Sequence, residues 1–196
     1  MIIWLNGAFG AGKTQTAFEL HRRLPGSFVF DPENAGYYIR KNVPRELAKP
    51  DFQDYPLWRE FNSSFLRYLD QHYSGTLIVP MTVVDPRYFE EIVGQLRKDG
   101  VVVRHFALCA TRETLLKRLR SRGERAAGWP AQQIDRCLAG LADEAFREHL
   151  HTDELSIRQV AETIAERLGI ALLPDNRSRL SRWKDRIATQ IRHIRF

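Results

Sequence analysis

Short apolar runs alternate along the chain with longer segments in which apolar residues recur at helical spacing. The runs are rich in β-branched and aromatic residues, as buried strands are, and they span residues 2–5, 27–30, 76–79, 101–108 and 149–152. Strands that alternate with helices form parallel sheets covered on both faces. The pattern therefore predicts an α/β fold, a three-layer sandwich with about five parallel strands.

Start and stop signals bound the predicted helices. Asp85 and Pro86 are typical of a helix N-cap and first position, and Ser156-Ile157-Arg158-Gln159 is a capping-box pattern. The polar segment 33–50 contains Pro44 and Pro50, which predict that it holds no long element. The expected helices lie within residues 13–24, 55–72, 85–98, 111–119, 131–141, 156–168 and 178–196.

A glycine-rich motif, G-x-x-x-x-G-K-T, follows the first apolar run. Its glycines let the backbone fold tightly around phosphate oxygens, and the helix that begins near Lys13 adds its positive dipole end. In this pattern the lysine reaches the β- and γ-phosphates and the Thr14 hydroxyl holds Mg²⁺, so ATP and Mg²⁺ are the expected cofactors. The alternative is a glycine-rich turn that binds nothing. The motif consists of Gly7, Ala8, Phe9, Gly10, Ala11, Gly12, Lys13 and Thr14.

Asp31 directly follows the second apolar run, where the acceptor of a small-molecule kinase would lie. A carboxylate there can accept the proton of the acceptor hydroxyl or hold Mg²⁺ through water. The alternative is that Asp31-Pro32 only initiates a turn. Glu33 is the substitute candidate for the same role.

Four arginines crowd the stretch from Arg118 to Arg125, and Gly123, Gly128 and Pro130 indicate that it is a mobile segment. Guanidinium groups suit phosphate oxygens, so residues 118–130 form a candidate lid in which Arg118 and Arg122 bind the nucleotide and Arg122 is catalytic. The alternative is an ordinary solvated basic helix.

Arg40 and Trp58 are candidates for an acceptor pocket, although helical spacing also explains Trp58 as a core residue. His149 and His151 would point to one side of a strand, but a metal site there needs a third ligand that the sequence does not identify. The third apolar run ends in Pro80-Met81-Thr82, without the aspartate that holds Mg²⁺ in many P-loop proteins. This argues against a motor or a GTPase and favours a small kinase.

The net charge of +6 is a property of the C-terminal end. Residues 177–196 carry seven basic side chains and one acidic one, and the charges of the remaining residues cancel. The two cysteines have no metal-ligand or CxxC spacing, which predicts a reducing, cytoplasmic setting. The sequence has no signal-peptide pattern and no run of 18 apolar residues.

Residues 174–196 are expected to form a separate basic amphipathic helix, after a kinase-like domain that spans residues 1–173. An apolar stripe runs along it, flanked by Lys and Arg, which is typical of a helix in a membrane interface. Two alternatives stay open, namely packing on the domain or on a second copy, and contact with nucleic acid. The stripe consists of Leu180, Trp183, Ile187, Ile191 and Ile194.

Over nearly its whole length, the sequence closely resembles the ATP-binding tunicamycin-resistance protein family. The stretches that carry this resemblance are IIWLNGAFGAGKTQTAFELHRRL, VFDPE, DFQDYPLWR, LIVPMTVV, ETLLKRLRSR, QIDRCLAGL and the basic end HIRF. The resemblance implies a nucleotide-kinase-like P-loop fold, ATP binding through residues 7–14 and protection against a nucleoside antibiotic. It also implies peripheral membrane association through the last helix.

The sequence is more distantly similar to antibiotic phosphotransferases and shikimate-type kinases. In those folds an aspartate after the second strand acts as base or metal partner, which matches Asp31, and lid arginines match the cluster from Arg118 to Arg125. The first hypothesis is therefore an ATP- and Mg²⁺-dependent kinase that phosphorylates a hydroxyl of a tunicamycin-type nucleoside. The second is a non-catalytic protein that sequesters the antibiotic at the membrane under ATP control. A nucleic-acid-associated ATPase is the weakest option, and nucleic acid is not an expected partner.

Overall fold

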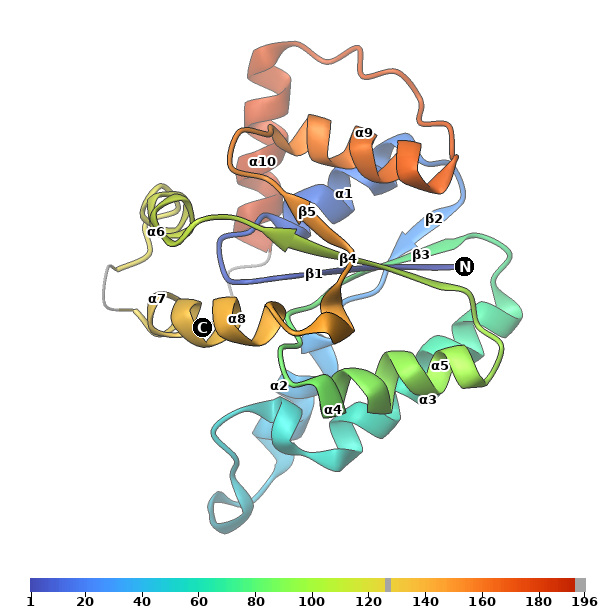
Figure 1. Ribbon diagram of the computed structural model, residues 1–196, viewed down its shortest axis with the longest axis vertical. Coiled ribbons are helices and arrows are strands. Elements are labelled where there is room, and N and C mark those ends of the chain that lie inside the picture. Colours follow the sequence, from blue (N-terminus) through green and yellow to red (C-terminus); the bar gives the residue numbers. More distant parts are fainter. Residues whose placement is uncertain (126–127, 193–196) are drawn as a thin grey trace.

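The computed structural model describes residues 1–125 and 128–192, and a five-stranded sheet forms its centre (Figure 1). The strands lie in the order β2-β3-β1-β4-β5, so β1 is the middle strand. Every neighbouring pair is parallel, which confirms the predicted sheet. The strands are β1 (Ile2–Gly7), β2 (Ser27–Val29), β3 (Thr76–Pro80), β4 (Val103–Cys109) and β5 (His149–His151).

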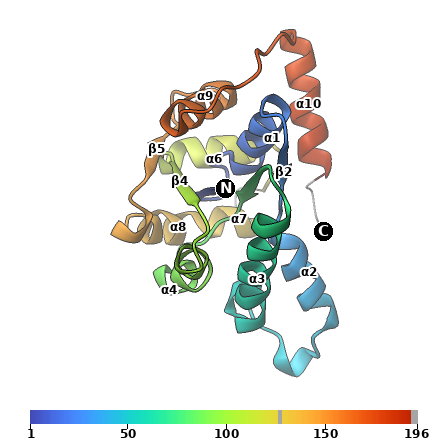
Figure 2. The same cartoon turned by 90° about the vertical axis from the view of Figure 1, so that its right-hand side faces the viewer.

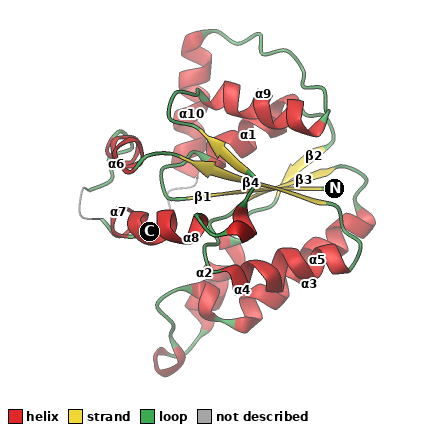
Figure 3. Ribbon diagram, viewed as in Figure 1, coloured by secondary structure: helices red, strands yellow, loops and turns green. Residues whose placement is uncertain are grey.

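Helices cover both faces of this sheet, which confirms the three-layer arrangement (Figure 3). The helices are α1 (Lys13–Arg23), α2 (Glu33–Asn42), α3 (Pro56–His72), α4 (Pro86–Phe89), α5 (Gln95–Lys98), α6 (Arg112–Arg120), α7 (Trp129–Gln132), α8 (Ile134–Leu141), α9 (Ile157–Leu168) and α10 (Arg179–Arg192). A π-helical turn (Glu90–Gly94) joins α4 to α5, and short 3₁₀ helices occupy Arg45–Leu47, Phe52–Asp54 and Glu144–Phe146.

The middle strand β1 shows how one sequence builds a core on two faces. Ile2 and Trp4 belong to the hydrophobic cluster that includes α3 and α5, whereas Ile3 and Leu5 belong to the cluster that includes α1 and α9. All four side chains are fully buried. Side chains of a strand point alternately to its two faces, so an unbroken apolar run fits a strand that is covered on both.

Helix α2 was not expected, because the prolines of segment 33–50 predicted no long element. The structure places ten helical residues before Pro44, which ends the helix instead of preventing it. Gly36 allows the helix to pack closely, since a Cβ there would lie 2.5 Å from the Phe52 ring. The prediction failed because a proline restricts the backbone at its own position and the one before it, and the residues up to Asn42 stay free to form a helix.

The predicted helix starts are confirmed by their caps. The Asp85 carboxylate accepts a hydrogen bond from the Arg87 N–H at 2.8 Å at the start of α4. At α9, Ser156 and Gln159 form both hydrogen bonds of a capping box. Thr111 caps α6 in the same manner, as its side chain accepts from the Thr114 N–H.

Helix α10 lies beside α1 on the same side of the sheet as α9 (Figures 1 and 2). Of the predicted apolar stripe, Leu180 and Ile187 are exposed. Ile194 and the side chains of Trp183 and Ile191 lie outside the described part of the chain. No helix in the described residues has the length and apolar character that a membrane span requires.

Candidate nucleotide site

The loop between β1 and α1 leaves the middle strand at its carboxyl end and turns sharply at glycines. Gly10 has a φ of 86° and Gly12 a φ of 96°, conformations that other residues rarely adopt. A Cβ at Gly10 would lie 2.9 Å from the Leu115 carbonyl oxygen, so a side chain has no room there. No side chain caps the amino end of α1, and its N–H groups and dipole therefore suit a phosphate.

Lys13 folds back over this loop. Its Nζ donates hydrogen bonds to the carbonyl oxygens of Gly7 at 2.9 Å and Ala8 at 3.1 Å. Burial lowers the pKa of Lys13 to about 8, and the nearby positive charge of Arg122 acts in the same direction, whereas Glu33 acts against it. A phosphate oxygen bound beside Lys13 would stabilise the charged form of this lysine and so raise its pKa.

Glu33 and Asp31 both lie at the carboxyl end of β2, but they have different roles in this structure. One oxygen of Asp31 accepts the Glu33 N–H at 3.0 Å and holds the first turn of α2. The Glu33 carboxylate acts on the charge of Lys13 and accepts a long hydrogen bond, 3.5 Å, from the Tyr37 hydroxyl. The hydrogen bond of Asp31 is the one that the turn alternative expects, and Glu33 is the carboxylate in the electrostatic field of the lysine.

Asn6 is a positioning residue that the sequence reasoning missed. Its fully buried side chain donates to the Val83 carbonyl at 2.7 Å and accepts from the N–H groups of Val83 at 3.0 Å and Gly7 at 2.8 Å. The Thr82 hydroxyl donates to the Gly7 carbonyl at 2.8 Å. These hydrogen bonds, hereafter the Asn6 brace, fix the start of the phosphate loop to the end of β3. A polar residue at the end of an otherwise apolar strand was the available signal.

A groove of about 1220 Å³ opens beside the loop. Its walls come from the phosphate loop and α1, the end of α6, the start of α9 and the C-terminal segment. Arginine is the commonest residue type along it, so the groove suits a polyanion. The arginines are Arg22, Arg118, Arg122, Arg158, Arg177 and Arg182, and the acidic residues are Glu19 and Asp185.

Two of the predicted phosphate-binding arginines, Arg118 and Arg122, line this groove together with Gly10 and Gly12. The Arg118 guanidinium donates to the Thr152 hydroxyl at 3.1 Å and to its carbonyl oxygen at 2.5 Å, which fixes α6 to the end of β5. Arg122 lies close enough to lower the pKa of Lys13. Residues 126–127 of the predicted lid lie outside the described part of the chain.

Comparison with known proteins places this site in a family. A family model described as an AAA domain matches residues 2–144. The structure of the Deinococcus radiodurans tunicamycin resistance protein is similar, with a TM-score of 0.77 and 39% sequence identity over 89% of this chain and 98% of that chain. The chain belongs to the tunicamycin resistance protein family. No match was found among curated proteins.

Solved kinases share the fold of this tunicamycin resistance family member at lower identity. A sugar kinase from Janibacter matches with a TM-score of 0.62 and 17% identity, over 87% of this chain and 95% of that chain. Shikimate kinase from Bacteroides thetaiotaomicron matches with a TM-score of 0.58 and 19% identity, over 87% of this chain and 99% of that chain. The phosphate loop therefore belongs to a nucleotide-kinase-like α/β fold.

The two residues predicted for the acceptor pocket make hydrogen bonds to the backbone in this family member. Trp58 is fully buried in the core, and its indole N–H donates to the Pro32 carbonyl at 3.0 Å. Its placement favours the core alternative over a role in binding substrate. Arg40 is exposed and donates to the Pro50 carbonyl at 2.5 Å, so it holds the segment that follows α2.

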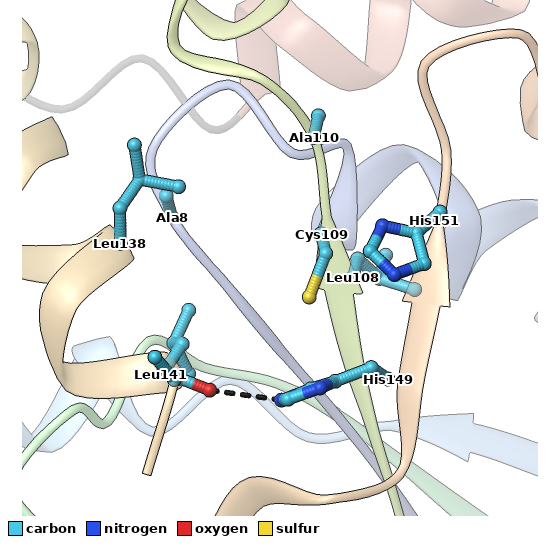
Figure 4. A pocket seen from close by; sticks show the side chains of 9 residues that line it. Ala8, Leu108, Cys109, Ala110, Leu138, Leu141, His149 and His151 are labelled. Atoms are coloured by element: carbon cyan, nitrogen blue, oxygen red, sulfur yellow. Dashed lines mark hydrogen bonds between the residues drawn. The ribbon is translucent and has the colours of Figure 1, made fainter.

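A second, smaller cavity of about 180 Å³ lies at the carboxyl ends of β4 and β5 (Figure 4). Cys109, His149 and His151 line it together with apolar side chains. Nε2 of His149 forms a hydrogen bond with the Leu141 carbonyl oxygen at 2.8 Å. Burial raises the pKa of the Cys109 thiol. Among the described residues no group of His, Cys, Asp or Glu is arranged to hold a metal ion.

Mg²⁺ prefers oxygen ligands and keeps several waters, and the phosphate-loop motif offers it the Thr14 hydroxyl. Thr14 stands in the first turn of α1, beside the uncapped N–H groups, and Asp31 and Glu33 follow β2. The Asp85 carboxylate has a structural role instead, since it caps α4 and pairs with Arg87 at 2.9 Å.

Proposed function

We propose that the protein confers resistance to a tunicamycin-type nucleoside antibiotic by transferring the γ-phosphoryl group of ATP to a hydroxyl of the drug. The observation that carries the proposal is the position of Lys13. It lies at the end of the middle strand, over the phosphate loop, within the fields of Arg122 and Glu33. The kinase-like fold and the family supply the chemistry class and the drug class.

In the proposed reaction the N–H groups of the loop and of α1 bind the phosphates. Lys13 leaves the carbonyls of Gly7 and Ala8 and donates to phosphate oxygens, and Arg122 neutralises charge that develops on the transferred group. The acceptor oxygen bonds to the γ-phosphorus as the bond to the β-phosphate oxygen breaks. The acceptor proton passes to the carboxylate of Asp31 or Glu33, and ADP leaves.

Mg²⁺, held by the Thr14 hydroxyl, would neutralise phosphate charge when bound. The chain's own contribution is to orient that hydroxyl, since Thr14 is fixed in the first turn of α1 directly after Lys13. A Thr14→Val variant keeps the volume and removes the oxygen. It should therefore weaken the dependence of ATP binding on Mg²⁺ and leave the fold intact, as calorimetry with and without Mg²⁺ can show.

The test of the proposed reaction is mass spectrometry of tunicamycin after incubation with the protein, ATP and Mg²⁺. A product heavier by one phosphate, formed together with ADP, supports the proposal. Asp31→Asn and Glu33→Gln are compared under the same conditions, and the variant of the true base should lose about a hundredfold in turnover while it still binds ATP. Wild-type turnover in both variants would remove the proposed base from the scheme.

The alternative is sequestration of the drug without turnover. One observation favours it, namely that an oxygen of Asp31 is already engaged with the Glu33 N–H. Full recovery of unmodified drug, bound more tightly in the presence of ATP, would establish this alternative in place of the kinase.

We also infer a cytoplasmic setting, with peripheral attachment to the inner face of the membrane through residues 177–196. The basic composition of this segment supports the inference, and the exposed Leu180 offers an apolar contact. Co-sedimentation with vesicles that contain anionic lipid tests it. The division into a domain of residues 1–173 and a tail of residues 174–196 is part of the same proposal.

A further inference from the structure

Helix α10 is part of the wall of the groove that holds the phosphate loop. Ile187, Ala188 and Thr189 line the same groove as Gly10 and Gly12. The phosphates of a nucleotide must lie at the glycines, so the nucleoside part extends along the groove away from them. The groove retains about 1220 Å³ with α10 in place, so the helix bounds the space and does not fill it.

Charged side chains attach the start of this segment to α1. The Asp175 side chain has no exposed surface, and oxygens of its carboxylate lie 2.8 Å from Arg177, 3.5 Å from Arg22 and 3.6 Å from Arg182. Arg177 also pairs with Glu19 of α1 at 2.7 Å and with Asp185 of α10 at 2.5 Å. We call this set of Glu19, Arg22, Asp175, Arg177, Arg182 and Asp185 the clasp.

The clasp and the nucleotide groove share residues. Glu19, Arg22, Arg177, Arg182 and Asp185 of the clasp line the groove as well. Arg177 contacts three carboxylates, from α1, from the segment before α10 and from α10 itself. A ligand that occupies the groove therefore touches the surface that the clasp holds in place, and ligand binding and helix docking must influence each other.

We propose that α10 is the outer wall of the nucleotide site, that Ile187 and Ala188 face the nucleoside part of ATP, and that the clasp keeps this wall in position. The proposal rests on the nucleotide site proposed above and adds to it a binding surface from the C-terminal helix. By linkage, ATP that contacts both the phosphate loop and α10 stabilises the docked helix, and a loosened helix binds ATP more weakly.

The first experiment places a negative charge on each of two positions of the same helix. Ala188→Glu puts a carboxylate into the groove, whereas Leu180→Glu puts it at a residue that is 61% exposed and outside the described groove lining. Calorimetry with Mg²⁺ and ATP should show about tenfold weaker binding for Ala188→Glu, because the larger, charged side chain then takes up space in the groove that the uncharged nucleoside would fill. Leu180→Glu should stay within about twofold of the wild type, because position 180 does not line the groove.

The second experiment loosens the clasp in the full-length protein. Asp175→Asn removes the charge that the arginines share, and Asp99→Asn is the matched control, since Asp99 pairs with Arg67 at 2.6 Å outside the groove lining. The readout is the rate of tryptic cleavage after Lys184, an exposed residue of α10. Asp175→Asn should speed this cleavage about fivefold and weaken ATP binding, while Asp99→Asn changes neither.

In the wild type, saturating ATP with Mg²⁺ should slow cleavage after Lys184. Far-ultraviolet circular dichroism of each variant shows that the body is folded. The proposal is overturned if ATP binds both Ala188→Glu and Asp175→Asn as tightly as it binds the wild type and leaves the cleavage rate unchanged. Absence of ATP binding in the wild type overturns the nucleotide site itself. If ATP binding and the docking of α10 depend on each other as expected but no phosphorylated drug forms, the proposal for α10 stands and the proposed kinase reaction is refuted.

Discussion

The phosphate loop and helix α10 border the same groove, but different forces hold them. The loop is fixed by the middle strand of the sheet and by the Asn6 brace, whose hydrogen bonds are buried. Helix α10 is fixed by the clasp, in which partly exposed arginines meet the buried carboxylate of Asp175 and the exposed one of Asp185. Buried hydrogen bonds to the backbone set a single geometry, whereas ion pairs with partly exposed partners depend more on salt. We therefore expect one wall of the groove to be rigid and the other to be adjustable.

The largest expected effect comes from Lys13→Ala on the rigid wall. The variant removes the only side-chain cation of the phosphate loop, and turnover of ATP should fall about a thousandfold if the proposed transfer takes place. The variant also removes the hydrogen bonds to the Gly7 and Ala8 carbonyls, but the strand and the Asn6 brace still hold the loop, so the thermal unfolding temperature should change little. Steady-state kinetics and calorimetric melting separate the two effects.

Asn6→Ala tests the brace itself. The substitution leaves the N–H groups of Gly7 and Val83 and the Val83 carbonyl without their partner in a buried place. The free energy of unfolding should fall by about 3 kcal/mol, measured by urea denaturation. Asn42→Ala is the matched control, because its side chain makes one exposed hydrogen bond, to the Tyr38 carbonyl at 2.7 Å. A loss of equal size in both variants would refute the role of the brace.

The difference between the two walls also explains which features the sequence could predict. The strands and the phosphate loop were predicted because the apolar runs and the glycine motif are local signals. The Asn6 brace joins residues 77 positions apart, and it forms because β1 lies beside β3, an adjacency that periodicity does not reveal. Arg177 and Glu19 are 158 positions apart, so periodicity along the chain could not predict that they pair. Trp58 has helical spacing whether it faces the core or a pocket, and only the fold decides.

The titration of Lys13 gives a smaller effect that again concerns the rigid wall. Its pKa is lowered to about 8 in the free protein, mainly by burial, and bound phosphate should raise it again. Above pH 8 the free protein has lost this proton and must regain it on binding. ATP affinity should therefore fall about tenfold per pH unit between roughly pH 8.5 and 10.

In the unfolded chain the lysine has its ordinary pKa of about 10.4. Between pH 8 and this value the unfolded state binds more protons than the folded state, so the free energy of unfolding rises with pH. Stability therefore increases over the same interval in which ATP affinity falls. Lys13→Arg is the control, since a guanidinium does not titrate there and its affinity should stay flat. Calorimetry at pH 9 in two buffers of different ionisation enthalpy measures the proton uptake directly. Zero uptake by the wild type would show that the buried ammonium does not titrate on binding.

The smallest expected effect concerns salt and the adjustable wall. Raising the salt concentration from about 0.05 M to 1 M shortens the range of charge interactions from more than 10 Å to about 3 Å, so the clasp should weaken while the brace does not. Hydrogen exchange without nucleotide should speed up a few-fold at the amides of α10, since salt screens the partly exposed members of the clasp. The amides of β1, buried along their whole length, should exchange at an unchanged rate. Equal acceleration in both elements would mean that salt acts on global stability, and the contrast between the two walls would then have no energetic basis. Acceleration confined to α10 would mean that the groove has one wall whose position solution conditions can change without unfolding the protein.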